Sequence, residues 1–270
     1  MAPGTLGQTL YGRNAVREAL RAGRRTLYRL LLAEGIGRET VIQELCRLAR
    51  ERGCPVEELP RETVARMARS REHQGVALEV GPYPYVEFEE ILARAQKAGN
   101  QAVVLVLDRV QDPQNLGTLL RTAEAVAVQG VLLPEHGAAQ VTPAVVKASA
   151  GAVEHLAIAR VTNLARALAA LQEAGLWAIG LEADAAAPLY TELDWDRPVA
   201  LVVGSEGFGL RRLLRGRCDS LARLPMRGRL SSLNAAVAGS VVLYEIWRSR
   251  EAAYRSGQAA AMERAPWRND

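Results

Sequence analysis

Apolar residues in the C-terminal part of the chain form short, nearly uninterrupted runs that alternate with amphipathic segments. The runs cover 102–108, 130–134, 155–161, 176–183, 199–204 and 220–225. Between most of these runs, apolar residues recur at helical spacing, in the segments 115–127, 142–150, 162–174, 209–217 and 233–250. Strands without apolar–polar alternation are buried on both faces, which is typical of a parallel sheet covered by helices. The pattern therefore predicts a mostly parallel α/β domain over residues 101–250.

The N-terminal part has a shorter pattern that predicts a separate, small α/β unit over residues 1–80. Helical spacing of apolar positions occurs at 13–22 and 39–52, and buried strands are expected at 26–33 and 75–80. The stretch GPYPYVEFEE follows, and its two prolines interrupt any regular element. We therefore expect a linker over 81–100 that includes a short helix. Residues 251–270 have weak periodicity and are expected to form a flexible tail.

Composition narrows the classes of protein that fit this pattern. The chain has 270 residues, of which 49% are apolar and 24% charged, so it can bury cores in two domains. No apolar stretch approaches the roughly 20 residues that span a bilayer, and the first residues lack the features of a signal peptide. Three scattered cysteines and three isolated histidines favour neither disulfides nor a metal site. We expect a cytoplasmic protein that binds no membrane and no metal.

The net charge of +4 is concentrated at one end of the chain. Residues 1–80 contain 14 Arg against 10 Asp and Glu, whereas the charges of the remaining residues balance. Arg binds phosphate through a planar fork and stacks on bases, so the surplus indicates a nucleic acid partner. A GC-rich genome, which favours Arg codons, would produce the same surplus, and the charge alone does not separate the two explanations.

Loops at the carboxyl ends of the predicted strands are where an open α/β sheet places its functional site. The loop after 102–108 reads DRVQDPQNLGTLLR and brings Asn115 and Arg121 near the start of a helix. A helix cap is the ordinary role of an Asn in this setting, and a solvated position is the ordinary role of the Arg.

Two further loops have unusual polar content. The segment LVVGSEGFGL, residues 201–210, ends a buried strand in a glycine-rich turn that contains Glu206, which is either a helix-entry carboxylate or a functional acid. The glycine spacing matches neither a dinucleotide fingerprint nor a Walker loop, but it permits close approach of the backbone to a ligand. The other segment, 223–234, runs from RLPM to SSLN, and Ser and Asn before a small-residue helix are ordinary cap residues.

Together and in this order, the three segments resemble the motifs of the SpoU class of RNA 2′-O-ribose methyltransferases. The matching elements are D-x-x-x-D-P-x-N-[LI]-G-x-x-x-R, G-x-E-x-x-G, and [LI]-P-M followed by S-S-L-N. The likeness includes YGRNAVREAL and HQGVAL near the N-terminus and covers roughly residues 8 to 250. This fuller pattern is similar to the bacterial subfamily that methylates a guanosine 2′-hydroxyl in the peptidyl-tRNA-binding loop of 23S rRNA.

The resemblance implies a fold, a cofactor and an assembly. The catalytic domain would be an α/β knot, a mostly parallel sheet with helices on both faces whose C-terminal part threads through itself as a trefoil. The knot loops would hold S-adenosylmethionine at the positions that match here, Val203, Gly204, Leu224, Met226 and Leu233. The protein would be a homodimer whose site is completed by the partner near the last helix.

The resemblance also implies roles for polar residues. Arg121 matches the residue assigned to activation of the 2′-hydroxyl. Because Arg stays protonated in proteins, we expect it to bind an RNA phosphate and to stabilise the developing oxyanion. Asn115, Glu206, Ser232 and Asn234 would orient Arg121, the ribose and the loops.

The N-terminal unit would be an RNA-binding module of ribosomal-protein-like fold. Its surplus Arg, with Arg13, Arg24 and Arg25 as candidates, would contact RNA phosphates and position the target. One departure from the family is the pair Ala235-Ala236 after Asn234, where Val-Ser is common. The missing hydroxyl matters if it normally helps to hold the loops or the substrate.

Three alternatives compete with this interpretation. The first is a SpoU enzyme acting on tRNA or another rRNA loop, although the usual tRNA enzymes mostly lack the N-terminal unit. The second is a non-catalytic RNA-binding or ribosome-assembly protein, against which the joint presence of Asn115, Arg121, Glu206 and Asn234 argues. The third is a nucleotide-binding or redox protein, which only the glycine-rich loop supports, and with the wrong spacing.

Overall fold

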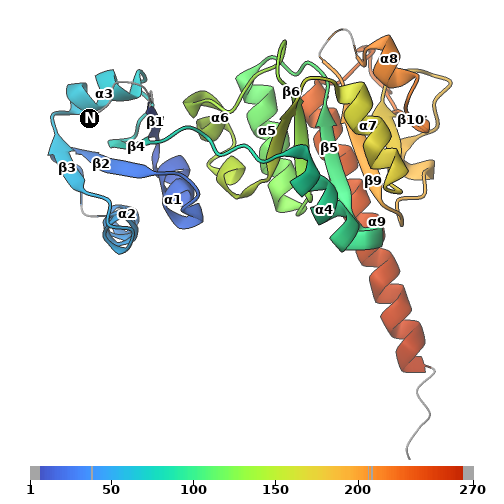
Figure 1. Ribbon diagram of the computed structural model, residues 1–270, viewed down its shortest axis with the longest axis horizontal. Helices are drawn as coiled ribbons and strands as arrows, with labels where there is room; N and C mark the ends of the chain where they lie inside the picture. Colours follow the sequence, from blue (N-terminus) through green and yellow to red (C-terminus); the bar gives the residue numbers. More distant parts are fainter. Residues whose placement is uncertain (1–6, 38, 206, 208, 264–270) are drawn as a thin grey trace, which may run out of the picture.

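The computed structural model describes the backbone of residues 7–37, 39–205, 207 and 209–263, and side chains as far as Glu251. Two units lie side by side, the smaller built from the N-terminal part of the chain and the larger from the rest (Figure 1). Each unit has a sheet covered by helices, so the predicted α/β class is confirmed.

The N-terminal unit is a small mixed sheet in the order β1-β4-β2-β3. Its elements are β1 (Gln8–Tyr11), α1 (Arg13–Ala22), β2 (Leu27–Ala33), α2 (Thr40–Glu51), β3 (Val56–Leu59), α3 (Arg61–Ala68) and β4 (Val76–Val80). Alternate residues of β2 face opposite sides: Leu30 and Leu32 belong to the core that includes α1 and α2, whereas Leu31 packs in the cluster of α3. Helices therefore cover both faces of this sheet.

The larger unit has a sheet in the order β10-β8-β9-β5-β6-β7, and every pairing in it is parallel. Its strands are β5 (Val103–Leu107), β6 (Gly130–Pro134), β7 (Ile158–Val161), β8 (Trp177–Leu181), β9 (Val199–Val203) and β10 (Ser220–Ala222). Its helices are α4 (Phe88–Ala98), α5 (Pro113–Ala125), α6 (Pro143–Ala148), α7 (Leu164–Glu173), α8 (Arg212–Arg215) and α9 (Ala235–Glu263). Short 3-10 turns occur at η1 (Gly99–Gln101), η2 (Ala152–His155) and η3 (Tyr190–Glu192).

Both faces of this sheet are buried, as the uninterrupted apolar runs predict. Val103 and Leu105 of β5 join the core formed with α5, α6 and α9, whereas Val104 and Val106 join the core formed with α4, α7 and α8. Gly239 lets α9 come close to α5, since a Cβ atom there would lie 2.6 Å from Cδ2 of Leu119. Helix α5 therefore makes the close approach that Gly239 permits.

Several element boundaries differ from the sequence prediction. The pattern missed β1, β3 and α3; the two strands are short and lie at the edges of their sheet, where partial exposure weakens the apolar signal. Helix α4, expected within a linker, packs on the sheet of the larger unit through Ile91 and Ala95. Helix α9 continues past residue 250 as far as Glu263. The trefoil knot and the mobility of the tail stay predictions.

The two units meet at a buried contact that we call the domain junction, formed by Arg24, Arg25, Tyr83 and Glu154. Nε of Arg25 donates to Glu154 at 2.8 Å and its Nη2 at 2.7 Å, and the two side chains are 0% and 1% exposed. Both Arg side chains lie over the ring of Tyr83, whose hydroxyl donates to the carbonyl of Leu156 at 2.8 Å. The junction therefore joins the units through one buried ion pair and through hydrogen bonds from Arg24 to backbone carbonyls.

Within the described residues, no helix combines the length and apolar character needed to cross a membrane. The same part of the chain contains no cluster of His, Cys, Asp and Glu side chains that could hold a metal ion.

Candidate active site

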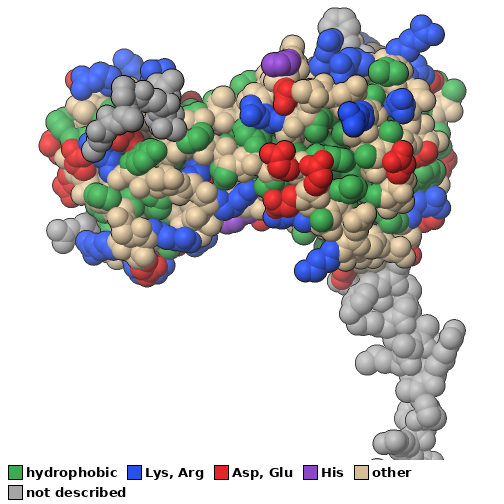
Figure 2. Space-filling view, viewed as in Figure 1, with side chains coloured by type: hydrophobic (Ala, Val, Ile, Leu, Met, Phe, Trp, Pro, Cys, Tyr) green, Lys and Arg blue, Asp and Glu red, His purple; other side chains and the backbone are tan. Residues whose placement is uncertain are grey.

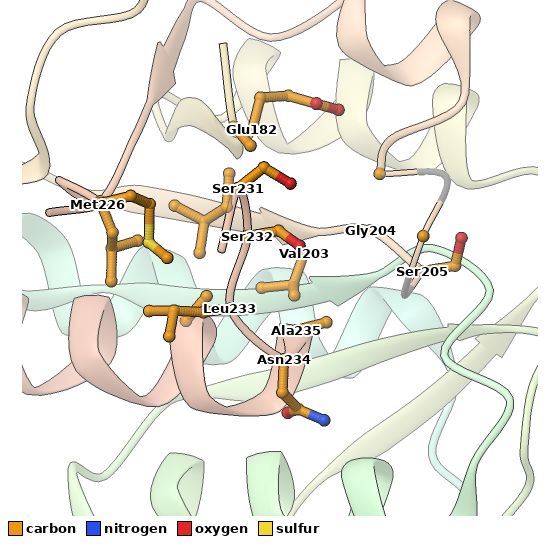
Figure 3. Close-up of a pocket in the computed structure, with 16 residues that line it drawn as sticks. Glu182, Val203, Gly204, Ser205, Met226, Ser231, Ser232, Leu233, Asn234 and Ala235 are labelled. Atoms are coloured by element: carbon orange, nitrogen blue, oxygen red, sulfur yellow. The ribbon is translucent and has the colours of Figure 1, made fainter. Parts of the chain in front are cut away.

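Loops at the carboxyl ends of β8, β9 and β10 enclose a cavity of about 460 Å³, which we call the strand-end cavity. The five residues that match cofactor-binding positions, Val203, Gly204, Leu224, Met226 and Leu233, all line it. Figure 3 shows Met226 and Leu233 on one side of this space and Gly204 and Ser205 on the other. Residues that are far apart in the sequence thus meet at the edge of the sheet where ligands of open α/β folds bind.

Polar groups interrupt the apolar wall at a few points. Ser231, Ser232 and Asn234 line the cavity from the segment before α9, and Glu182 lines it from the loop after β8. One carboxylate oxygen of Glu182 accepts the backbone N–H of Leu210 at 2.7 Å, which ties the loop after β8 to the loop after β9. Glu182 belongs to none of the three sequence motifs, although it comes directly after a strand, where open α/β sheets place their functional residues.

The glycine-rich turn after β9 requires its glycines for steric reasons. A Cβ atom on Gly204 would overlap the backbone carbonyl of Gly209. Ser205 and Gly209 exchange two backbone hydrogen bonds, at 3.1 and 3.0 Å, so the turn closes tightly. Gly209 adopts φ 61° in the left-handed region, which glycine occupies without strain. Glu206, predicted as an orienting acid, lies outside the described residues.

Asn115 and Asn234 contact each other across 119 residues of sequence. Nδ2 of Asn234 donates to Oδ1 of Asn115 at 2.9 Å, while Oδ1 of Asn234 accepts the backbone N–H groups of Ala236 and Val237 at the start of α9. The cap of α5 is Asp112, whose carboxylate accepts the N–H of Gln114. The structure therefore uses Asn115, which is buried, to join α5 to the first turn of α9.

Arg121 does not reach the strand-end cavity within one chain. It is exposed on α5, and its guanidinium forms no hydrogen bond or ion pair with described residues. Its neighbour Thr122 points to α9 instead, with its hydroxyl 2.8 Å from that of Ser240. Residues 115 and 121 are six positions apart, which places them on different faces of a helix.

The departure at Ala235-Ala236 leaves this arrangement intact. Ala236 is 1% exposed and belongs to the core beneath the sheet, while Ala235 lines the strand-end cavity. The link between Asn234 and Asn115 uses side-chain amides and needs no hydroxyl at 236. A Ser at 236 would have to find a hydrogen-bond partner inside the core.

The three N-terminal Arg candidates have different surroundings. Arg13 is 28% exposed in its side chain and forms an ion pair with Glu39. Arg25 is buried against Glu154, and Arg24 donates to the carbonyls of Leu156 and Pro84. Because the domain junction occupies both guanidinium groups, Arg24 and Arg25 are not retained as RNA contacts. The role of Arg13 stays a prediction.

A doubly covered parallel sheet with a ligand-sized cavity at its carboxyl edge, joined to a second small α/β unit, defines a two-unit α/β protein with a ligand-binding site of the open-sheet kind. The sequence profile of the SpoU rRNA Methylase family matches residues 102–244, and the profile described as RNA 2′-O ribose methyltransferase substrate binding matches residues 9–86. The chain therefore belongs to the SpoU family of RNA methyltransferases.

Individual relatives agree with this membership. The chain is 41% identical over 239 residues to a Bacillus subtilis protein assigned to the TrmH family of tRNA/rRNA methyltransferases, covering 88% of this chain and 94% of that protein. An rRNA methyltransferase of Sinorhizobium meliloti, solved with bound AdoMet, is 27% identical with a TM-score of 0.71, covering 90% and 87% of the two chains. The SpoU methyltransferase AviRb of Streptomyces viridochromogenes has the same fold, with 24% identity, a TM-score of 0.74 and 90% coverage of both chains.

Proposed function

We propose that this protein transfers a methyl group from S-adenosylmethionine to the 2′-hydroxyl of a guanosine in the peptidyl-tRNA-binding loop of 23S rRNA. The observation that carries the proposal is the strand-end cavity, which gathers all five matching cofactor positions beside the linked pair Asn115 and Asn234. A SpoU enzyme that modifies tRNA or another rRNA loop is the second candidate. A cytoplasmic location follows from the substrate.

The lining of the strand-end cavity suits S-adenosylmethionine. Apolar side chains of Val203, Leu224, Met226 and Leu233 can cover an adenine ring, and the turn at Gly204 offers backbone groups without a Cβ atom in the way. Glu182 adds a half-buried carboxylate to a cavity that would receive a cationic ligand. When bound, the cofactor supplies an electrophilic methyl group on a positively charged sulfur.

The protein's own contribution is positioning and charge stabilisation. Asn115 and Asn234 hold the first turns of α5 and α9 in a fixed relation at the mouth of the cavity, which favours in-line placement of the ribose oxygen. Arg121 would bind an RNA phosphate and stabilise the oxygen as it loses its proton. Ser232, exposed on the same rim, would contact the ribose.

A second copy of the chain would bring Arg121 to the site. Helix α9 exposes Val237, Val241, Tyr244 and Trp247, between 36% and 51%, along the side next to α5 and η3. Unpaired apolar faces of this kind mark interfaces, and α5, which carries Arg121, packs beside α9. We propose a homodimer through α9 in which Arg121 of one protomer serves the cavity of the other.

The N-terminal unit supports rRNA over tRNA as the substrate. Its match to a substrate-binding profile over residues 9–86 gives the chain an RNA-contacting domain besides the catalytic one. The junction fixes that domain against the catalytic sheet, so the RNA would have to fit both surfaces at once. A structured rRNA loop offers such an extended shape.

The test is methyl transfer from labelled S-adenosylmethionine to an unmodified 23S rRNA transcript, with ribose methylation mapped by nucleotide. A single 2′-O-methylguanosine in the peptidyl-tRNA-binding loop is the expected result. Methylation at another rRNA position or on unmodified tRNA would keep the enzyme class and overturn the proposed target. Absence of cofactor binding would favour the non-catalytic RNA-binding function. Size-exclusion chromatography with light scattering tests the homodimer, and Trp247→Glu is expected to yield monomers.

A further inference from the structure

A second cleft adjoins the strand-end cavity, and the three sequence motifs do not account for its basic residues. It lies between the loop after β5 and the loop after β9, and shares Ser205, Gly209 and Ala235 with the cavity. Arg109 and Arg211 line it together with Asn115. We call it the arginine cleft. Its position beside the linked Asn115 makes it the place where the nucleotide next to the cofactor would lie.

Arg109 has a strained backbone that its own contacts do not explain. Its φ is 60°, in the left-handed region that non-glycine residues enter at a cost. Arg69, Ala127 and Ala150, which also have positive φ, follow the ends of helices, whereas Arg109 follows strand β5. Its side chain is exposed and forms no hydrogen bond or ion pair with described residues. Strain without a compensating internal contact indicates a functional position.

Arg211 is held in place by a buried carboxylate. Asp108 is 0% exposed; its Oδ1 accepts Nε of Arg211 at 2.7 Å and its Oδ2 accepts the backbone N–H of Arg211 at 3.0 Å. This contact engages Nε and leaves the two terminal amino groups of the guanidinium without partners among the described residues. The side chain is 44% exposed. Arg211 is therefore fixed in orientation and still able to bind a ligand.

The free donors of the cleft, more than its net charge, favour an anion, because the guanidinium of Arg109 and the terminal amino groups of Arg211 have no partner among the described residues. Among the described residues its titratable lining is Arg109, Arg211 and Asp112, and the carboxylate of Asp112 already caps α5. Asp108 lies beneath the surface and is neutralised by Arg211. Figure 2 shows Lys and Arg side chains gathered over the loops near α8, at this end of the sheet, while acidic side chains gather lower, over α4. The ligand that fits two guanidinium groups beside a ribose site is an RNA phosphate.

We propose that Arg109 and Arg211 bind backbone phosphates next to the methylated ribose and thereby position the substrate. This proposal rests on the proposed function. Asp108 and Arg109 are adjacent in the chain, so one loop both anchors Arg211 and carries the second guanidinium. The two residues are substrate-positioning residues, since the reacting oxygen and methyl group would lie in the neighbouring cavity.

Arg109→Gly is the informative variant because it removes the guanidinium and relieves the strained backbone at the same time. We expect an unfolding temperature equal to or above that of the wild type, unchanged binding of S-adenosylmethionine, and about a tenfold rise in KM for unmodified 23S rRNA transcript. The slope of log Kd against log salt for the labelled transcript should fall by about one. A stabilised protein with weakened RNA binding is a result that a structural role of Arg109 would not produce.

Two further variants and one control complete the experiment. Arg109→Lys keeps the charge and should retain the salt slope with a smaller rise in KM. The double variant Asp108→Asn with Arg211→Gln removes the second cation without leaving a buried carboxylate unpaired, and should also lower the slope by about one. Lys97→Ala removes an exposed cation near the opposite end of β5 and should change neither quantity.

The outcomes separate this proposal from the proposed function. If the wild type methylates RNA and Arg109→Gly has the wild-type KM and salt slope, the phosphate role is wrong. If KM rises without any change in slope, Arg109 contacts a base instead of a phosphate, which also overturns the proposal. If the wild type methylates neither rRNA nor tRNA, the proposed function is wrong, whatever the variants do.

Discussion

The domain junction and the arginine cleft each contain a fully buried carboxylate that holds an arginine, and they differ in what remains accessible. At the junction, Glu154 pairs with Arg25, and both side chains are excluded from solvent. At the cleft, Asp108 is equally buried, but the side chain of Arg211 stays 44% exposed. The first pair uses its donors within the protein, whereas the second leaves terminal donors for a ligand.

Burial of the carboxylate therefore does not by itself indicate whether an ion pair only stabilises the fold or also leaves its arginine able to bind a ligand. A closed pair is stable only while both charges are present, because removing one leaves the other unsolvated. An open pair tolerates that loss better, since water can solvate the exposed arginine. The substitutions Glu154→Gln and Asp108→Asn measure this difference directly.

Glu154→Gln should destabilise the protein by about 3 kcal/mol, because the buried guanidinium of Arg25 would lose its counter-charge. Equilibrium urea denaturation followed by circular dichroism measures the change in unfolding free energy. Glu173→Gln is the matched control, since Glu173 is an exposed carboxylate at the end of α7 without a partner among described residues. Equal losses in the two variants would show that the junction pair is dispensable.

Arg121→Ala should lower the rate of methyl transfer by about 10²- to 10³-fold, the usual effect of removing a group that stabilises an oxyanion. Binding of S-adenosylmethionine should not change, because Arg121 does not line the strand-end cavity. Single-turnover transfer and calorimetric binding measure the two quantities. Arg166→Ala removes another exposed helix arginine, from α7 on the opposite face of the sheet. It should change neither the rate of methyl transfer nor the binding of S-adenosylmethionine. A folded Arg121→Ala protein that no longer binds the cofactor would contradict this role.

Asp108→Asn should cost about 1–2 kcal/mol of unfolding free energy, less than Glu154→Gln, because the partly exposed Arg211 stays solvated without its partner. Both substitutions replace a buried carboxylate by an amide of the same shape, so the urea experiment compares like with like. A loss as large as that of Glu154→Gln would mean that Arg211 is shielded from water in solution. It would contradict the proposed accessibility of its terminal amino groups.

Lowering the pH should reduce the free energy of unfolding through protonation of His73, and this is the smallest of the four predicted effects. Burial, with a smaller contribution from Arg61, lowers the pKa of His73 below 6.5, and its Nδ1 accepts the N–H of Gly75 at 3.1 Å. The folded state thus binds this proton less readily than the unfolded state. The contribution of neutral His73 to the free energy of unfolding is therefore fully present above pH 6.5. It is lost as the pH falls below that value and the histidine becomes protonated. His73→Gln should flatten this part of the stability–pH curve, whereas His136→Gln, at an exposed histidine, should leave it unchanged.

The sequence pattern predicted most of the fold because most elements are long or fully buried. Helix α1 has the predicted limits of 13–22, and the central strands of the catalytic sheet lie within one or two residues of theirs. The seventh strand is an exception: its run begins at 155, but His155 is the last residue of the turn η2 and β7 starts only at Ile158. Apolar content alone does not distinguish a buried turn from a buried strand.

The candidate site was predicted where its residues lie in the motifs and was missed elsewhere. Gly204, Met226 and Leu233 line one cavity as expected, whereas Glu182 comes from a loop without a motif. Asn115 was weighed as a helix cap, but the cap is Asp112, since only the distance to Asn234 reveals what Asn115 contacts.

The sequence by itself determined the class, the family and the position of the cavity, because hydrophobic periodicity and motif spacing are properties of neighbouring residues. Only the tertiary structure decided which arginines are free. Arg25, predicted to bind RNA, is neutralised by Glu154 129 residues away, and Arg211 is anchored by Asp108 across 103 residues. Charge pairing depends on distance in space and on exclusion of water, and neither is encoded locally along the chain.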